Sequence, residues 1–307
     1  MPHVHGLHHV TAVTASARGN LAFWRDVLGL RFVKKTVNFD DPSAYHLYYG
    51  DELGRPGSTM TFFAWERMAP GRRGAGEVTE TRLAVPAGAL DWWAERLAVA
   101  GCATARGARF DAPHLTFRDP DGLDLALVEA PDDPRAPWTT PTVPPAAAIR
   151  GLHGVTLALA DPAPTADLLT ALMDYRERGA DGGLRRLDAP TGAAAPVVDL
   201  ATVSAGAARL GAGSVHHVAF AVADRAGQEA VRAKLIDAGH QVTPPIDRDY
   251  FHAIYFRTPG GVVFEVATEG PGFTVDEPAH RLGGALQLPR QHEHRRAQLE
   301  RSLPPLA

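Results

Sequence analysis

Short runs of β-forming residues recur along the chain, and each run is followed by a helical pattern of apolar and polar positions. The runs begin at residues 6, 151 and 214 and read GLHHVTAV, GLHGVTLA and SVHHVAFA, while a weaker copy, TRLAVP, begins at residue 81. Helical patterns cover 20–28, 89–100, 165–173 and 228–238, and a glycine follows three of them, a common signal for a helix end. The pattern therefore predicts a repeated unit of one strand and one helix.

About three more strand-like runs, separated by turn residues, follow each helix, which predicts four βαβββ modules at 6–66, 77–130, 151–204 and 214–269. A stretch with six prolines at 131–145 indicates a stiff linker, and a Gly- and Asp-rich stretch at 179–192 indicates a loop. We expect an α+β fold in two domains of two modules each, residues 1–145 and 146–285. The polar residues 286–307 should form a surface helix that fades into disorder.

Histidines occupy matching places in two of the repeated runs. Because alternate residues of a strand face opposite sides, His9 shares a face with Thr11 and Val13, and His217 shares a face with small alanines. The small face should line a cavity, while the bulky face packs against the helix. The third run has Gly154 at this place, so only two modules offer a histidine to the cavity.

An acidic residue interrupts the apolar last strand of the fourth module. Glu265 is costly there unless it is paired or binds a metal, and its counterparts in the second and first modules are Ala126 and, approximately, Thr61. A single strand histidine is usually only hydrogen-bonded, but the repeated His-His pair together with Glu265 favours a metal site. Two histidines and one carboxylate leave up to three coordination positions of Fe(II) or Mn(II) open.

Further polar residues lie beside these three in the sequence. His8 and His216 precede the ligand histidines, and Arg248, His252 and Tyr255 lie one strand before Glu265. Tyr255 can be read equally well as a core aromatic or as a hydrogen-bonding group that faces a substrate. The aromatic run 45–49 is interpreted as core rather than as part of a pocket.

Composition and charge exclude several classes of protein. The net charge is −4, from 31 basic and 35 acidic residues, which argues against a general nucleic-acid or anionic-membrane binder. A single cysteine, Cys102, excludes an internal disulfide and a Cys-rich zinc site, and no apolar run approaches the ~20 residues of a membrane span. We expect a cytoplasmic protein with small-molecule partners and no nucleic-acid or membrane partner; a homo-oligomer is compatible with the sequence.

Several longer motifs carry a resemblance to a known superfamily. They are LHHVT at 7–11, RFVKKT at 31–36, YHLYYGDELG at 45–54, VHHV at 215–218 and RTPGGVVFE at 257–265. With these motifs the chain resembles the vicinal oxygen chelate superfamily, which includes glyoxalase I, bleomycin-resistance proteins and extradiol dioxygenases. Within it, the chain is most similar to ring-cleaving dioxygenases that open hydroquinones rather than catechols.

The resemblance implies glyoxalase-like open-barrel sheets, an aromatic substrate, O₂, and Fe(II) bound by His9, His217 and Glu265. Mn(II) is the alternative native metal, and another divalent metal such as zinc or nickel could occupy the site after purification. Catalytic roles then fall to His8, His216, Arg248 and Tyr255, and substrate contacts to Thr11 and His252. Two alternatives stay open: a glyoxalase-type isomerase, whose fourth ligand would be expected near Thr61, and a non-catalytic binding protein on the same fold.

Overall fold

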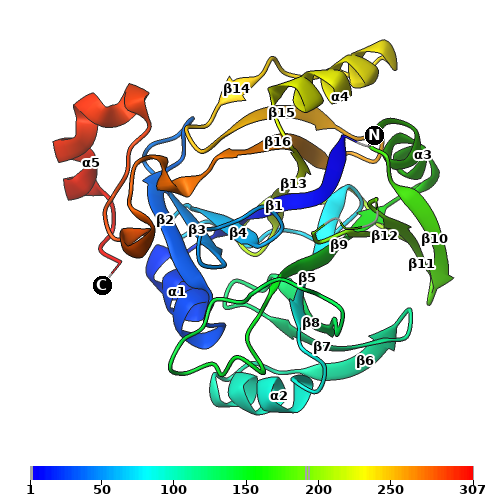
Figure 1. Ribbon diagram of the computed structural model, residues 1–307, viewed down its shortest axis with the longest axis horizontal. Coiled ribbons are helices and arrows are strands. Elements are labelled where there is room, and N and C mark those ends of the chain that lie inside the picture. The colour runs from blue at the N-terminus through cyan, green and yellow to red at the C-terminus, as the bar shows by residue number, and fades with distance from the viewer. Residues whose placement is uncertain (1–2, 191, 193, 307) are drawn as a thin grey trace.

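The structure is a computed structural model that describes residues 3–190, 192 and 194–306. It contains four βαβββ modules in chain order (Figure 1), which confirms the repeat expected from the sequence. The first two modules comprise β1 (Val4–Thr14), α1 (Ala17–Leu21), β2 (Arg31–Val37), β3 (Tyr45–Gly50), β4 (Thr59–Ala64), β5 (Glu77–Val85), α2 (Leu90–Val99), β6 (Ala105–Arg109), β7 (Ala112–Arg118) and β8 (Asp124–Glu129). The last two comprise β9 (Gly151–Leu159), α3 (Ala163–Leu172), β10 (Arg176–Asp181), β11 (Leu184–Asp188), β12 (Val197–Thr202), β13 (Val215–Val222), α4 (Arg225–Asp237), β14 (Ile246–Asp247), β15 (Phe251–Arg257) and β16 (Val263–Pro271).

Local sequence signals explain where the helices begin and end. The side chain of Asp224 accepts a hydrogen bond from the Gly227 amide and caps α4, and Ser16 caps α1 in the same way through the amide of Gly19. Gly239 follows α4 with a φ of +87°, a backbone conformation that only glycine adopts without strain. The first helix continues beyond α1 as one π-helical segment, Ala22–Val27, close to the end expected at residue 28.

Two curved eight-stranded sheets form the architecture, with the helices on their outer faces (Figure 1). The first half-barrel has the strand order β14-β15-β16-β13-β1-β4-β3-β2, and the second half-barrel has the order β10-β11-β12-β9-β5-β8-β7-β6. Each sheet is therefore built from two modules, joined through an antiparallel pair of their first strands, β1 with β13 and β5 with β9. This arrangement confirms the expected open-barrel α+β fold.

The modules that share a sheet are not those grouped from the sequence, which placed the first with the second and the third with the fourth. The first module pairs with the fourth, and the second pairs with the third, so each sheet joins strands from both sides of residue 145. The division into domains 1–145 and 146–285 stays a prediction about folding units, and it does not coincide with the division between sheets. The proline-rich stretch is attached to the first and the third module, because Arg135 donates hydrogen bonds to the carbonyls of Gly57 and Leu152.

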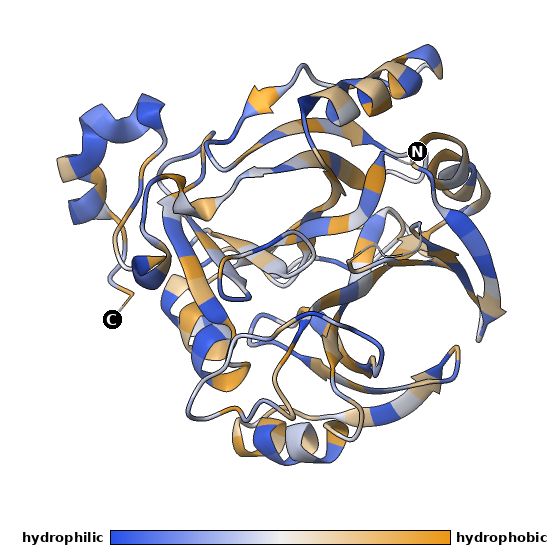
Figure 2. Cartoon of the chain, in the orientation of Figure 1, coloured by the Kyte–Doolittle hydropathy of each residue, from blue (hydrophilic) through white to orange (hydrophobic). Residues whose placement is uncertain are grey.

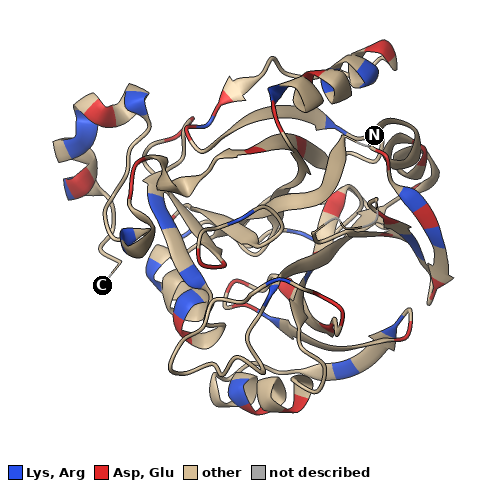
Figure 3. Ribbon diagram, in the orientation of Figure 1, with Lys and Arg blue, Asp and Glu red and all other residues tan. Residues whose placement is uncertain are grey.

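Two segments differ from their expected structure. The stretch 179–192 was expected to be a loop, but part of it forms the hairpin of β10 and β11, whose first strand is almost entirely hydrophilic (Figure 2). The tail does not fade into disorder within the described residues: it forms α5 (Arg296–Ser302), which carries charges of both signs (Figure 3). Leu299 and Leu303 anchor it, because both side chains are buried. None of the described helices is both long and apolar enough to cross a lipid bilayer.

Candidate metal centre and active-site cavity

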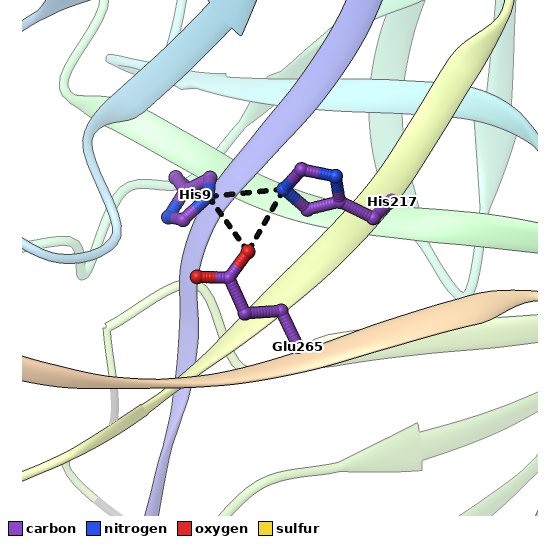
Figure 4. Close-up of side chains that lie close together, drawn as sticks. All are labelled: His9, His217 and Glu265. Carbon is purple, nitrogen blue, oxygen red and sulfur yellow. Dashed lines mark hydrogen bonds and ion pairs between the residues drawn. The ribbon is translucent and has the colours of Figure 1, made fainter. Parts of the chain in front are cut away.

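Three buried side chains converge inside the first half-barrel (Figure 4). The Nε2 atom of His217 lies 2.9 Å from Oε2 of Glu265, and Nε2 of His9 lies 3.5 Å from the same oxygen. The two Nε2 atoms lie 3.4 Å apart. The side chains that the sequence selected as metal ligands therefore come together at one point, deep in the structure.

The strand registers explain this convergence. His9 on β1 pairs with Ala219 on β13, and Thr11 pairs with His217, so the two histidines lie diagonally opposite on one face. Glu265 on β16 pairs with Ala219, which places its carboxylate beside both of them. Because Ala219 is the partner of both His9 and Glu265, its small side chain leaves the space in which the three side chains meet.

The donor set fits a divalent metal ion. Glu265 is fully buried, and neither of its oxygens has a hydrogen-bond partner of suitable geometry among the described residues. A carboxylate left in this state costs free energy that a bound cation would offset. Burial alone would raise the pKa of Glu265, but the adjacent His9 and His217 outweigh it and hold that pKa well below its usual range. The carboxylate is therefore ionised and available as a ligand.

A second histidine supports each ligand histidine from behind. Nδ1 of His8 lies 2.9 Å from Nδ1 of His9, and Nδ1 of His216 lies 2.8 Å from Nδ1 of His217. Burial lowers the pKa of His8 and of His216 to about 3, so both rings are neutral and can accept a hydrogen bond. Each ligand histidine can then donate from Nδ1, which leaves the lone pair of its Nε2 directed at the metal position.

A cavity of about 970 Å³ opens in front of the three ligands. Its polar lining includes His46, Tyr48, His216, Arg248 and Tyr255, and its apolar lining includes Phe39, Phe63, Trp65 and Phe251. The volume and the aromatic walls suit a small planar ligand next to the metal position.

Tyr255 and Arg248 form a polar pair on one side of this cavity. Nε of Arg248 donates to the Tyr255 hydroxyl over 3.3 Å, and Tyr255 pairs with Glu265 across β15 and β16. Burial, followed by the charge of Glu265, raises the pKa of Tyr255 well above its usual value, so the phenol stays protonated. Because Arg248 supplies a donor to its oxygen, Tyr255 can donate its own hydrogen to an acceptor, either the neighbouring Glu265 or a ligand in the cavity. The structure thus places Tyr255 at the cavity, rather than only in the core.

The opposite side of the cavity carries a hydrogen-bonded chain that the sequence analysis missed. Tyr48 Oη lies 2.9 Å from Nδ1 of His46, whose Nε2 lies 2.8 Å from Oγ1 of Thr61. Thr61 in turn lies 2.7 Å from Oγ1 of Thr11. His46 and Tyr48 were interpreted as core, but both line the cavity. Their place follows from the strand registers: Tyr48 pairs with Thr61 as Tyr255 pairs with Glu265, so the two tyrosines hold equivalent places.

Thr11 and His252, the residues expected to contact the substrate, do not line the cavity. Thr11 is fully buried and reaches the site through its hydrogen bond with Thr61. His252 is not brought to this cavity, because it points to the face of β15 opposite that of Phe251 and Tyr255. His153 lies in the other sheet and lines a separate small void.

Comparison with known proteins agrees with this geometry. The sequence profile of the Glyoxalase/Bleomycin resistance protein/Dioxygenase superfamily matches residues 115–266. The "Putative ring-cleaving dioxygenase MhqO" of Bacillus subtilis is 41% identical over 300 residues, 98% of this chain and 96% of that protein. The "Chlorohydroquinone/hydroquinone 1,2-dioxygenase" of Sphingobium indicum is 36% identical over 309 residues, with 98% of this chain and 96% of that protein covered.

Solved structures show the same relationship. A crystal structure described as a "putative dioxygenase" from Bacillus subtilis superposes with a TM-score of 0.97 at 40% identity and covers 100% of this chain and 99% of that one. Glyoxalase I from Zea mays, at 13% identity and a TM-score of 0.63, covers 86% of this chain and 92% of that one and shares the fold. The resemblance inferred from the sequence is confirmed: the chain belongs to the glyoxalase/bleomycin resistance protein/dioxygenase superfamily, among its ring-cleaving dioxygenases.

Proposed function

We propose that this protein uses Fe(II) and O₂ to open the ring of a hydroquinone-type substrate. The observation that carries the proposal is the buried set of His9, His217 and Glu265 beside an aromatic-walled cavity, with a carboxylate whose neighbours are the two histidine nitrogens. Relatives at 36–41% identity that are described as ring-cleaving and hydroquinone dioxygenases support the reaction class. Mn(II) is the alternative ion, because the same donor types suit it.

The bound ion would supply Lewis acidity and a common binding place for a substrate oxygen and O₂. The protein's own residues orient the ligands, supply negative charge and hold the substrate ring. His8 and His216 fix the tautomers of the ligand histidines, and the fully buried Glu265 gives the site its negative charge. Phe251 and Phe63 are placed to hold the flat face of a ring and to keep water out.

Arg248 and Tyr255 are assigned to the hydroxyl that cannot reach the metal. The two oxygens of a para-diol are too far apart to chelate one ion, so the second hydroxyl needs a partner in the protein. Tyr255, protonated and supported by Arg248, can donate its hydrogen to that oxygen and stabilise negative charge that develops on it. Opening the ring between the other hydroxylated carbon and its neighbour, with both atoms of O₂ retained, yields an acid and an aldehyde.

The position of Thr61 argues against the isomerase alternative. Thr61 pairs with Thr11 as Glu265 pairs with Ala219, so it holds the place from which a second carboxylate ligand would come. A threonine that is already hydrogen-bonded to His46 and Thr11 is a poor metal ligand. The site is also complete within one chain, so the homo-oligomer that is compatible with the sequence is not required for it.

Oxygen uptake tests the proposal. The purified protein is loaded anaerobically with Fe(II) and then supplied with O₂ and a panel of hydroquinones and catechols. We expect uptake with hydroquinones, in proportion to bound iron, and slower uptake with catechols. The same protein loaded with zinc or nickel and supplied with the methylglyoxal–glutathione adduct is the control for isomerase activity. Isomerase turnover without oxygen uptake would overturn the proposal.

A further inference from the structure

The C-terminal tail after β16 runs along one edge of the first half-barrel (Figure 1). β2 is the last strand of that sheet, and the tail joins it where Leu286 forms a β-bridge with Lys35. The amide of Gln287 donates to the carbonyl of Lys35 over 2.9 Å. Beyond this point the tail forms a 3₁₀-helical segment, Arg290–Arg295, and it contacts the loop 38–44 that connects β2 with β3.

Two side chains of this segment bind one carbonyl group of the loop. Nε2 of Gln291 donates to the carbonyl oxygen of Phe39 over 2.7 Å, and Nε2 of His292 donates to the same oxygen over 2.8 Å. A carbonyl oxygen has two lone pairs, so the tail uses the full acceptor capacity of this group. The contact is made by tertiary structure, because 252 positions separate Gln291 from Phe39 in the sequence.

The loop in turn contacts the guanidinium group of Arg248. This group lies 5.3 Å from the ring centre of Phe39 and 5.3 Å from the ring centre of Tyr255, both within the range of a cation–π contact. Nη2 of Arg248 also lies 3.4 Å from Oδ2 of Asp40. Arg248 follows β14 in a turn whose next residue, Asp249, has a φ of +65°. Because Arg248 lies outside the strands, these side-chain contacts hold its guanidinium group in place.

We propose that Gln291 and His292 are positioning residues of the active site. Through the loop that they hold, the tail keeps Arg248 in place beside Tyr255. This inference rests on the proposed function, because Arg248 and Tyr255 are assigned there to the remote hydroxyl of a para-diol. Hydroquinones need that pair and catechols do not, so the tail would contribute to the choice between the two kinds of substrate.

The double variant Gln291→Ala/His292→Ala removes both donors and leaves the residues that line the cavity unchanged. In the Fe(II)-loaded protein, its kcat/KM for hydroquinone should fall by roughly threefold or more, within the range of one lost hydrogen bond. Its kcat/KM for catechol should change by less than about 1.5-fold, since catechol does not use Arg248. Bound iron and Tm should stay unchanged.

Two further variants separate positioning from a general effect on the tail. Gln291→Ala/His292→Gln keeps one donor near the position of Nε2 and should recover most of the hydroquinone activity. His294→Ala removes an exposed side chain of the same segment and should behave like the wild type. Equal losses for hydroquinone and catechol, or the same loss in His294→Ala, would show that the tail has only a structural role.

Phe39→Leu tests whether the tail acts through this loop. The substitution keeps the carbonyl group that the tail binds but removes the ring beside Arg248. Adding Gln291→Ala/His292→Ala to Phe39→Leu should therefore cost little further hydroquinone activity. Losses that multiply fully in the combined variant would contradict the proposed connection.

Amide hydrogen exchange gives a readout that does not depend on turnover. Peptides that cover 38–44 should exchange faster in Gln291→Ala/His292→Ala than in the wild type, because the loop opens more often when the tail releases it. His294→Ala should leave their exchange unchanged. A wild-type protein that opens no ring would refute the proposed function, and the exchange result would still decide whether the tail holds the loop. Unchanged exchange at 38–44 in the double variant would overturn the inference.

Discussion

Replacing Tyr255 by phenylalanine removes the hydroxyl that we assign to the remote oxygen of a para-diol, while the ring that packs beside His217 is retained. The ring centroids of Tyr255 and His217 lie 5.8 Å apart, so the substituted side chain fills the same space. A hydrogen bond to a neutral substrate oxygen contributes about 0.5–1.5 kcal/mol, and one to a charged oxygen about 1.5–3 kcal/mol. Since ~1.4 kcal/mol corresponds to a tenfold change in rate, kcat/KM for hydroquinones should fall by up to roughly tenfold if the oxygen is neutral, and by about ten- to a hundredfold if it is ionised.

The assay compares hydroquinone with catechol by oxygen uptake at matched iron content. Catechol can place both oxygens on the metal, so its kcat/KM should fall by about threefold or less, equivalent to ~0.6 kcal/mol. Tyr48→Phe is the matched control, because Tyr48 holds the equivalent place in the first module but bonds to His46 instead of Arg248. Its effect should be similar for the two substrates. Equal losses for hydroquinone and catechol in Tyr255→Phe would refute the remote-hydroxyl role.

Three further predictions concern the metal, a buried ion pair and one buried acid. Glu265→Gln should abolish tight metal binding and oxygen uptake while circular dichroism shows an intact fold, since the apolar strand around it loses a charge; full metal content in the variant would contradict its role as ligand. Lys34→Met should lower the free energy of unfolding by about 3–5 kcal/mol in denaturant titrations, because fully buried Lys34 pairs with Glu277 and Asp276 and its loss leaves buried Glu277 without a cationic partner. Burial raises the pKa of Asp119 to about 7, so its contribution to stability is present below the unfolded pKa of about 4 and is lost as pH rises through 7. Asp119→Asn should therefore gain stability over the wild type between pH 4 and about 7, and parallel stability–pH curves would contradict this.

The sequence predicted the modules and the ligands because both depend on local patterns. Strand alternation alone places His9 and His217 on the small face of each repeat, and a carboxylate in the apolar strand around Glu265 is costly unless a cation or a hydrogen-bond donor compensates it. The structure adds the distances, and it shows that the preceding histidines face Nδ1 of the ligand rings.

What the sequence did not predict depends on tertiary pairing. The sequences of the repeats do not indicate that the first module pairs with the fourth. This pairing brings His9 next to His217. Asp199 was missed as the counterpart of Glu265 because the third module is irregular and its equivalence follows only from the register of β9 and β12. The hairpin of β10 and β11 was missed because β10 is exposed along most of its length and shows no alternation of apolar and polar residues.

Isotope labelling tests most directly whether this site inserts both atoms of O₂ into an aromatic ring. The anaerobic Fe(II)-loaded protein is mixed with hydroquinone and ¹⁸O₂ for a single turnover, and the product is analysed by mass spectrometry. We expect a ring-opened product, with an acid and an aldehyde group, that carries both labelled atoms before exchange with water, and no such product from Glu265→Gln. Unlabelled product, or oxidation of hydroquinone to quinone without ring opening, would contradict this expectation.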